Sequence, residues 1–314
     1  MNTKILSIFV VMLLVGVFVI TYDFQTTGNK IILEDLIIEN LTAKDLILSG
    51  PVVPKAESPV GNITIEPTAQ ISNVPKTMPV FMVKPSNISK SDVHRLADKL
   101  GLKGTPGEYN NKIGLVDNAR VIDIDKSSGR IGYTDSEKIY EVSENLPPES
   151  EAVIIASDFL KKMNMLPEDA YMLQVATDDM SVRDKNTDEL LGYKEVNRQV
   201  MFGRKVQGYE AIGSGTSIKV YVSDNGYISG FKKPWSDLVY LKDMNLKTST
   251  EAFQDLKNGT GRTMRQNEPG LSNIEINSVK LGYMVPMSGY AQPVYIFEDT
   301  SRENGFKSMV QAVR

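Results

Sequence analysis

The feature that most constrains this chain is an uncharged apolar run near its first residue. Ile5 to Tyr22 contains no Asp, Glu, Lys or Arg. Eighteen residues in an α-helix extend about 27 Å, which is close to the thickness of the hydrocarbon core of a bilayer. No comparable run follows in the 314-residue chain. The sequence therefore predicts one membrane span that carries one large polar part.

Two interpretations of this run compete, a retained anchor and a cleaved signal peptide. A signal peptide has a shorter apolar stretch, of about 7–15 residues, and small residues at its cleavage site. Here bulky residues occupy the exit from Val19 to Phe24, and the chain has no cysteine for lipid attachment. These features favour an anchor. Because Lys4 precedes the span and Asp23 is the first charge after it, we expect a cytoplasmic N-terminus and an extracytoplasmic body.

The composition excludes several classes of site. The residues are 41% hydrophobic and 24% charged, which is typical of a globular protein with a full core. A net charge of −4 gives no basic footprint for nucleic acid. Without cysteine, the chain cannot form disulfides, iron–sulfur clusters or a thiol nucleophile. His94 is the only histidine, and its place at the edge of a helical apolar stripe is typical of a solvated residue.

The chain divides into parts of different composition. The expected parts are a cytoplasmic tip and anchor (1–22), an extended stalk with short strands (23–78), a first α+β module (79–147) and a larger α+β region (148–314). The larger region is one module or two, and in the second case the division is expected near residue 245. Seven of the fifteen prolines lie between Pro51 and Pro85. The stalk is expected there because proline favours extended backbone.

After the stalk, helix signals alternate with strand signals. Helices are expected to begin at Ser89-x-x-Asp92, at Pro147-Pro148-Glu149 and at Thr248-x-x-Glu251, since two of these are capping boxes and proline suits a first turn. Alternating apolar residues around short turns predict hairpins at 121–133 and 217–231. Single helices between runs of antiparallel strands are typical of the α+β class. We therefore expect antiparallel sheets, each packed by a helix, in tandem modules.

The order of these elements resembles that of two known families. Strands ending in Lys205-Val-Gln-Gly-Tyr-Glu-Ala211 are followed by a strand–Asn-Gly–strand hairpin, a Trp-containing exit and the short helical segment 250–259. This order is similar to PepSY-type modules in propeptides of secreted peptidases. It is also similar to the YycH/YycI membrane-anchored regulators of a cell-wall sensor kinase, which have a late Tyr-rich strand pair near a segment like 292–297. The resemblance covers roughly residues 79–314. It implies tandem PepSY- or cystatin-like modules and non-catalytic action by contact.

One candidate site is a calcium loop. Asp184, Asn186, Asp188 and Glu195 provide oxygen ligands at a spacing that suits Ca²⁺. However, Glu189 stands where the sharp turn of such a loop needs glycine. A hairpin turn with polar residues accounts for the same sequence. No catalytic or cofactor-binding residues are expected.

A second candidate is the segment around the single tryptophan. Lys232, Lys233 and Trp235 lie within five residues of Phe231. Tryptophan is enriched at binding hot spots, so these residues are a candidate contact for a partner protein. A tryptophan that closes a small core explains the pattern as well.

The sequence thus predicts a single-pass, membrane-anchored, extracytoplasmic protein that binds and regulates another envelope or membrane protein without catalysis. Two alternatives stay open. One is a hydrolase, such as a glycosidase, that uses two of the 39 acidic residues. The other is a structural or ligand-binding module of the envelope. No cofactor and no nucleic acid partner are expected.

Overall fold

The computed structural model describes residues 42–46, 62–66, 69, 71, 73–185, 187–265, 273–301 and 305–314. All of them belong to one compact unit, residues 41–314. The predicted anchor, Ile5 to Tyr22, lies outside the described residues. Within the described ranges, no helix combines the length and the apolar character that a membrane crossing needs.

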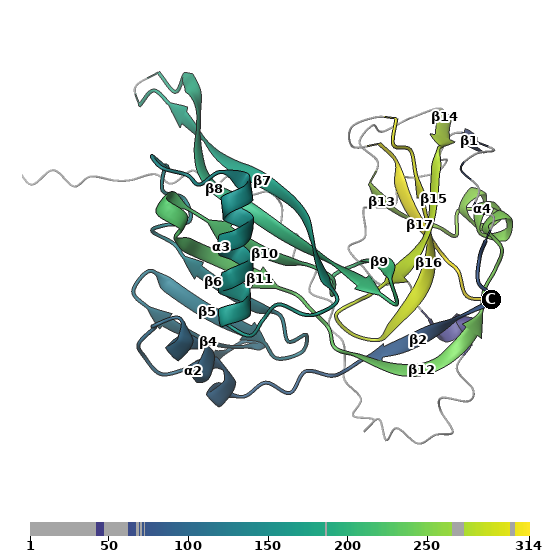
Figure 1. Cartoon of the computed structure of the whole chain (residues 1–314), viewed down its shortest axis with the longest axis horizontal. Helices are drawn as coiled ribbons and strands as arrows, with labels where there is room; N and C mark the ends of the chain where they lie inside the picture. Colours follow the sequence, from purple (N-terminus) through teal and green to yellow (C-terminus); the bar gives the residue numbers. More distant parts are fainter. Residues whose placement is uncertain are drawn as a thin grey trace, which may run out of the picture. The chain divides into compact units, whose positions relative to one another are not determined.

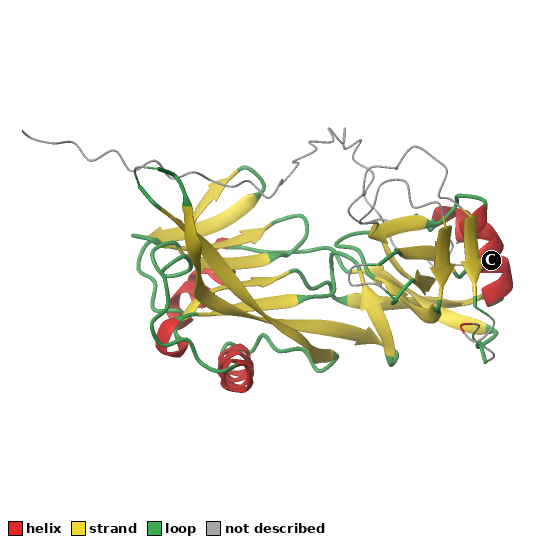
Figure 2. Cartoon of the chain, turned by 90° about the horizontal axis from the view of Figure 1, so that it is seen from above, coloured by secondary structure: helices red, strands yellow, loops and turns green. Residues whose placement is uncertain are grey.

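Strands dominate the described chain, so the expected α+β fold is wrong (Figure 2). The α-helices of the described part are α2 (Lys90–Lys99), α3 (Glu149–Lys162) and α4 (Ser249–Lys257). The strands are β1 (Asn62–Ile65), β2 (Thr77–Val83), β3 (Gly107–Tyr109), β4 (Lys112–Asp117), β5 (Arg120–Asp125), β6 (Ile131–Asp135), β7 (Ala170–Arg183), β8 (Leu190–Val206), β9 (Tyr209–Ile212), β10 (Ile218–Val222), β11 (Ile228–Lys233), β12 (Leu238–Asn245), β13 (Arg262–Arg265), β14 (Asn273–Ile276), β15 (Ser278–Met284), β16 (Tyr290–Glu298) and β17 (Lys307–Gln311).

Most of these strands form one mixed sheet rather than separate sheets in tandem modules. Fifteen strands are joined by hydrogen bonds, mainly in the order β12-β2-β16-β15-β9-β8-β10-β11-β6-β5-β4-β3. β8 is 17 residues long and pairs with β7, β9 and β10, so it joins the two halves of this path. The module prediction failed because local patterns give each strand but not its distant partner.

The three helices begin where the sequence predicts. Ser89 and Asp92 form the expected capping box of α2, and Thr248 and Glu251 form that of α4. α3 begins directly after Pro148. Helix ends are set by neighbours in the sequence, which is why these signals can be read without the fold.

The first core lies between α2, α3 and one face of the strands β4, β5, β6, β8, β10 and β11 (Figure 1). Leu96 of α2 and Leu160 of α3 pack with Val220 of β10 and Phe231 of β11. Side chains alternate along a strand, so the residues next to Val220 and Phe231 point to the opposite face of the sheet.

The second core surrounds β16, which is buried on both faces. Tyr295 and Phe297 are fully buried there, and Phe297 packs on Phe253 of α4 at a ring distance of 6.0 Å. The described part of the expected stalk contributes to this core. β2 pairs with β12 and β16, β1 pairs in parallel with β14, and Leu46 and Ile63 are buried.

Residues 213–217 connect β9 to β10 and pass close to the backbone that follows β15. A Cβ at Gly213 would lie 2.5 Å from the Val285 carbonyl oxygen, and Gly213 has a φ of +117°. A Cβ at Gly215 would lie 2.6 Å from the Pro286 carbonyl oxygen. Only glycine allows the two backbone segments to approach this closely.

Candidate functional site

The first candidate site is a pocket of about 450 Å³ beside the single tryptophan. Trp235 is 9% exposed, and the Arg204 guanidinium lies 5.0 Å from the centre of its ring. Arg204 Nε also donates to Asp169 Oδ2 at 2.7 Å, and its Nη1 donates to the Ser236 carbonyl at 2.6 Å. The buried guanidinium therefore ties three chain segments together around the indole ring.

The structure places Lys233 at this pocket but not Lys232. Lys233 follows Phe231 on the helix-facing side of β11, and burial lowers the pKa of its ammonium group while Asp237 opposes that shift. Lys232 is exposed on the opposite face of the sheet. The predicted cluster is therefore divided by strand alternation. Arg204, which holds the pocket together, has no local signal because its partners are distant in the sequence.

The second candidate site is the face of the sheet that is turned away from α2 and α3, where Lys232 lies. Its Cα partner across β10 and β11 is Lys219, which is half-buried. The same lateral row passes over neighbouring strands through Gly114, Asp123, Gly132, Lys232, Lys219 and Met201. Burial lowers the pKa of Lys219, Asp178 opposes the shift, and the charge of Lys232 adds to it.

The third candidate site is the far end of the β7–β8 hairpin (Figure 1). β8 pairs with β10 only as far as Arg198, and beyond Glu195 the described residues of β7 and β8 pair only with each other. This projecting part carries three apolar side chains in four residues. Leu190, Leu191 and Tyr193 are 43%, 63% and 68% exposed. The sequence pattern of 184–195 was interpreted as a calcium loop or as a polar hairpin turn, and neither interpretation gives weight to these apolar side chains.

The described calcium candidates take ordinary places in that hairpin. Asp184 Oδ1 accepts from the Thr187 backbone N–H at 2.9 Å, which stabilises the turn. Asp188 has a φ of +57°, and its carboxylate is 3.7 Å from Arg183. Glu195 is opposite Asp179 along the ribbon and pairs with Arg198 at 3.3 Å. Asn186 lies outside the described residues, and no group of three His, Asp or Glu suited to a metal is found among the residues described.

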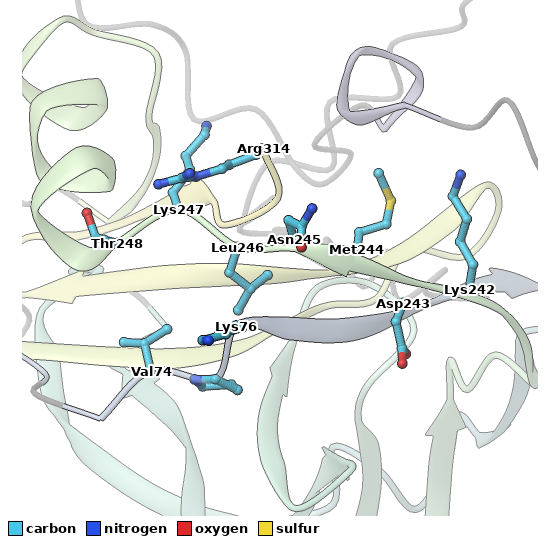
Figure 3. A pocket seen from close by; sticks show the side chains of 11 residues that line it. Val74, Lys76, Lys242, Asp243, Met244, Asn245, Leu246, Lys247, Thr248 and Arg314 are labelled. Carbon is cyan, nitrogen blue, oxygen red and sulfur yellow. The ribbon is translucent and has the colours of Figure 1, made fainter.

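A groove of about 710 Å³ runs along β12 to the start of α4 (Figure 3). Lys242 and Asp243 point to opposite sides of β12 in this view. Two of the groove's cations are already paired, since Lys247 Nζ lies 2.9 Å from Asp255 and Arg314 lies 2.7 Å from Glu251. These ion pairs join α4 to the neighbouring backbone.

The Glu251 carboxyl gives this groove an acid-sensitive contact. Its pKa falls from an ordinary 4.5 to about 2, first because of the Thr248 backbone N–H, then because of Arg314 and the Thr248 hydroxyl. A lowered pKa in the folded state means that the ionised group stabilises the fold above pH 4.5 and loses that effect as the pH falls towards 2.

Replacing Glu251 with glutamine should therefore lower the denaturation midpoint at neutral pH, and this loss should shrink as the pH falls from 4.5 to about 2. Denaturant titrations across that range measure it. The control is Glu168→Gln, because Glu168 is exposed outside any helix or strand. A loss that stays constant with pH would contradict the assignment of the stabilisation to the ionised carboxylate.

Other carboxyl groups with a shifted pKa are also shifted downward. The Lys103 backbone N–H lowers the pKa of Asp117 most, and the Ser143 hydroxyl does so for Asp224. Lys307 and Lys280 lower the pKa of Glu298, although burial opposes this shift more strongly than any single donor favours it. A general acid of a glycosidase needs the opposite shift. These carboxylates fit structural roles.

Comparison with known proteins gives no family. No family model matches the chain, and no curated protein matches it. An uncharacterized protein from Eubacterium rectale is similar in structure, with 13% identity, 78% of this chain and 84% of that chain covered, and a TM-score of 0.41. The Bacillus megaterium YpeB C-terminal domain has 14% identity, 73% and 94% coverage, and a TM-score of 0.37.

Proposed function

We propose that this chain is a non-catalytic binding protein that regulates another envelope or membrane protein by direct contact. The observation that carries the proposal is the projecting β7–β8 hairpin. A two-stranded ribbon has little stability of its own in water, and clustered apolar side chains on a surface are typical of contact sites. Leu190, Leu191 and Tyr193 supply such exposed apolar side chains within four residues of the ribbon.

The contact is made by side chains rather than by addition of a strand. The pairing of β7 with β8 shifts register at three places, after Met172, Asp178 and Val182. Such irregularities twist an edge and protect it from pairing with a foreign strand. The outer edge of β7 is therefore a poor template for strand addition, whereas the tip offers an aromatic ring and two leucines to a partner's groove.

The place of this contact is outside the cytoplasm in our proposal. The apolar run Ile5 to Tyr22, with Lys4 before it, supports a single anchor whose body is extracytoplasmic. Protease added to intact cells should therefore digest the body, whereas a tag at the N-terminus should stay protected. Digestion only after the cells are broken would overturn this topology.

Replacing Leu191 and Tyr193 with serine should remove partner capture without changing stability by more than about 0.5 kcal/mol, because both side chains are exposed. A photo-reactive residue at position 190 of the full chain, expressed in its own cells, measures capture. The expected result is one discrete cross-linked protein that disappears in the double variant.

The matched control is a photo-reactive residue at Ile154 of α3, which is 61% exposed. It should give no such product. If Ile154 captures the same protein as position 190, or if the serine variant keeps its cross-link, the hairpin is not the contact element and the proposed function loses its main support.

A further inference from the structure

Two lysines are cross-strand partners on the side of the sheet that is turned away from α2 and α3. Lys219 of β10 and Lys232 of β11 are Cα partners, and they point away from α2 and α3 because their neighbours Val220 and Phe231 point towards the helices. Like charges directly across two strands destabilise a sheet. Among the described residues neither lysine forms an ion pair within 4.0 Å, and Asp178 acts on Lys219 only through its charge.

The nearby acids are occupied by other groups. Asp178 Oδ1 accepts a hydrogen bond from the Gln199 amide. Asp123 Oδ2 accepts from Lys112 at 2.8 Å and from the Tyr109 hydroxyl at 3.3 Å. These contacts hold both carboxylates beside the lysine pair rather than on it.

The surface around the two lysines, called the trough below, combines an open glycine with aromatic rings at its borders. Next to Lys232 in the lateral row is Gly132, where an added Cβ would meet only Asp123 Oδ1, at 3.4 Å. One wall is Tyr221, since its ring and Ile139 lie over Gly230. The other wall is the Tyr171 ring, which lies over Gly203. Gly132 therefore leaves the sheet surface open beside Lys232, whereas side chains fill the space over Gly203 and Gly230.

We propose that this trough binds an extended acidic segment of the partner protein, an inference that rests on the proposed contact function. Carboxylates of such a segment would balance both ammonium groups, and glycine at position 132 would let its backbone approach the sheet. Charge-assisted hydrogen bonds to lysine are stronger than neutral ones, so acidic side chains fit the trough better than polar neutral ones. An acidic segment also relieves the repulsion between Lys219 and Lys232.

The test uses the full chain in mild detergent and a fluorescent peptide of alternating glutamate and valine. Fluorescence polarisation should show binding that weakens with salt, and a peptide with glutamine in place of glutamate should not bind. Replacing Lys219 and Lys232 with glutamine should weaken binding about tenfold or more. If the double variant does not fold, Lys232→Glu alone replaces it, because Lys232 is exposed. This variant should also weaken peptide binding.

The matched control is Lys161→Gln with Lys162→Gln, which removes the same charge from exposed positions on α3. It should leave peptide binding unchanged. Equal binding of both peptides, or equal loss in the α3 control, would overturn the proposal. Self-association of the chain that requires Lys219 and Lys232 would also overturn it, because a second copy would then occupy the trough. The chain with Leu191 and Tyr193 replaced by serine should still bind the peptide. This result distinguishes a failure of the hairpin contact from a failure of the lysine site.

Discussion

Replacing Gly213 with alanine is expected to destabilise the fold by about 3 kcal/mol or more, because strain and a backbone clash act together. The residue has a φ of +117°, and the new Cβ would lie 2.5 Å from the Val285 carbonyl oxygen and 2.8 Å from Met284 Sδ. The sulfur can move, but the carbonyl belongs to the backbone that follows β15. The segment between β9 and β10 must shift away from it.

Gly208→Ala is the matched control, because Gly208 also has a positive φ, of +82°, but no atom lies within 4 Å of the new Cβ. It should cost only the strain, about 1–2 kcal/mol. Denaturant midpoints of the two variants, measured under the same conditions, separate the two effects. Equal midpoints would show that the close approach at Gly213 has no energetic weight.

The second large effect is expected for Arg204→Met. This change removes the charge over Trp235, the partner of Asp169 and the donors to the Ser236 and Gly215 carbonyls. Removing one partner of a buried ion pair costs about 3–5 kcal/mol when the other charge is fully buried. The Asp169 side chain is 36% exposed, so the expected loss is near the lower end, about 3 kcal/mol.

Denaturant unfolding followed by tryptophan fluorescence measures this loss, because Trp235 is the only tryptophan and lies against the guanidinium. Arg204→Lys should recover part of the loss, since lysine keeps the charge but not the fork of donors. The control is Arg95→Met, because Arg95 forms an exposed pair with Asp92 and should cost less than about 1 kcal/mol. Comparable losses for Arg204 and Arg95 would be inconsistent with a structural ion pair at Trp235.

Local elements of this fold can be predicted from the sequence. The capping boxes at Ser89 and Thr248 gave the starts of α2 and α4, and the Asn-Gly turn near Asn225 gave the β10–β11 hairpin. Each signal concerns residues within a few positions of one another. His94 likewise lies exposed on α2, 3.8 Å from Asp98, as its position beside the apolar stripe suggested.

Strand partners that are distant in the sequence could not be predicted. β16 is buried along nearly its whole length on both faces, so it lacks the alternation that marks a half-exposed strand. β2 pairs with β12 and β16, and no pattern in 77–83 indicates either partner. The predicted α+β class was wrong for this reason. Short-range sequence patterns indicate the helices, but they do not indicate that the strands form one continuous sheet.

The candidate sites show the same limit. Lys232 and Lys233 are neighbours in the sequence, but alternation along β11 puts them on different faces. Lys219 became relevant only through the register of β10 with β11. The hairpin tip was visible in the sequence as Leu190, Leu191 and Tyr193, but its exposure depends on where β10 ends.

The position of β2 between β12 and β16 determines the order in which this molecule can mature. A chain that leaves the ribosome from its N-terminus completes 77–83 long before 238–298 exist, and the Tyr283 hydroxyl that binds the Pro79 carbonyl is 204 residues later. Until then β2 has two open edges and no sheet. Such non-local pairing makes folding slow and exposes the nascent chain to aggregation. The second core is therefore completed only after β16 has been synthesised, and a truncated chain lacking β16 leaves β2 without one of its two strand partners.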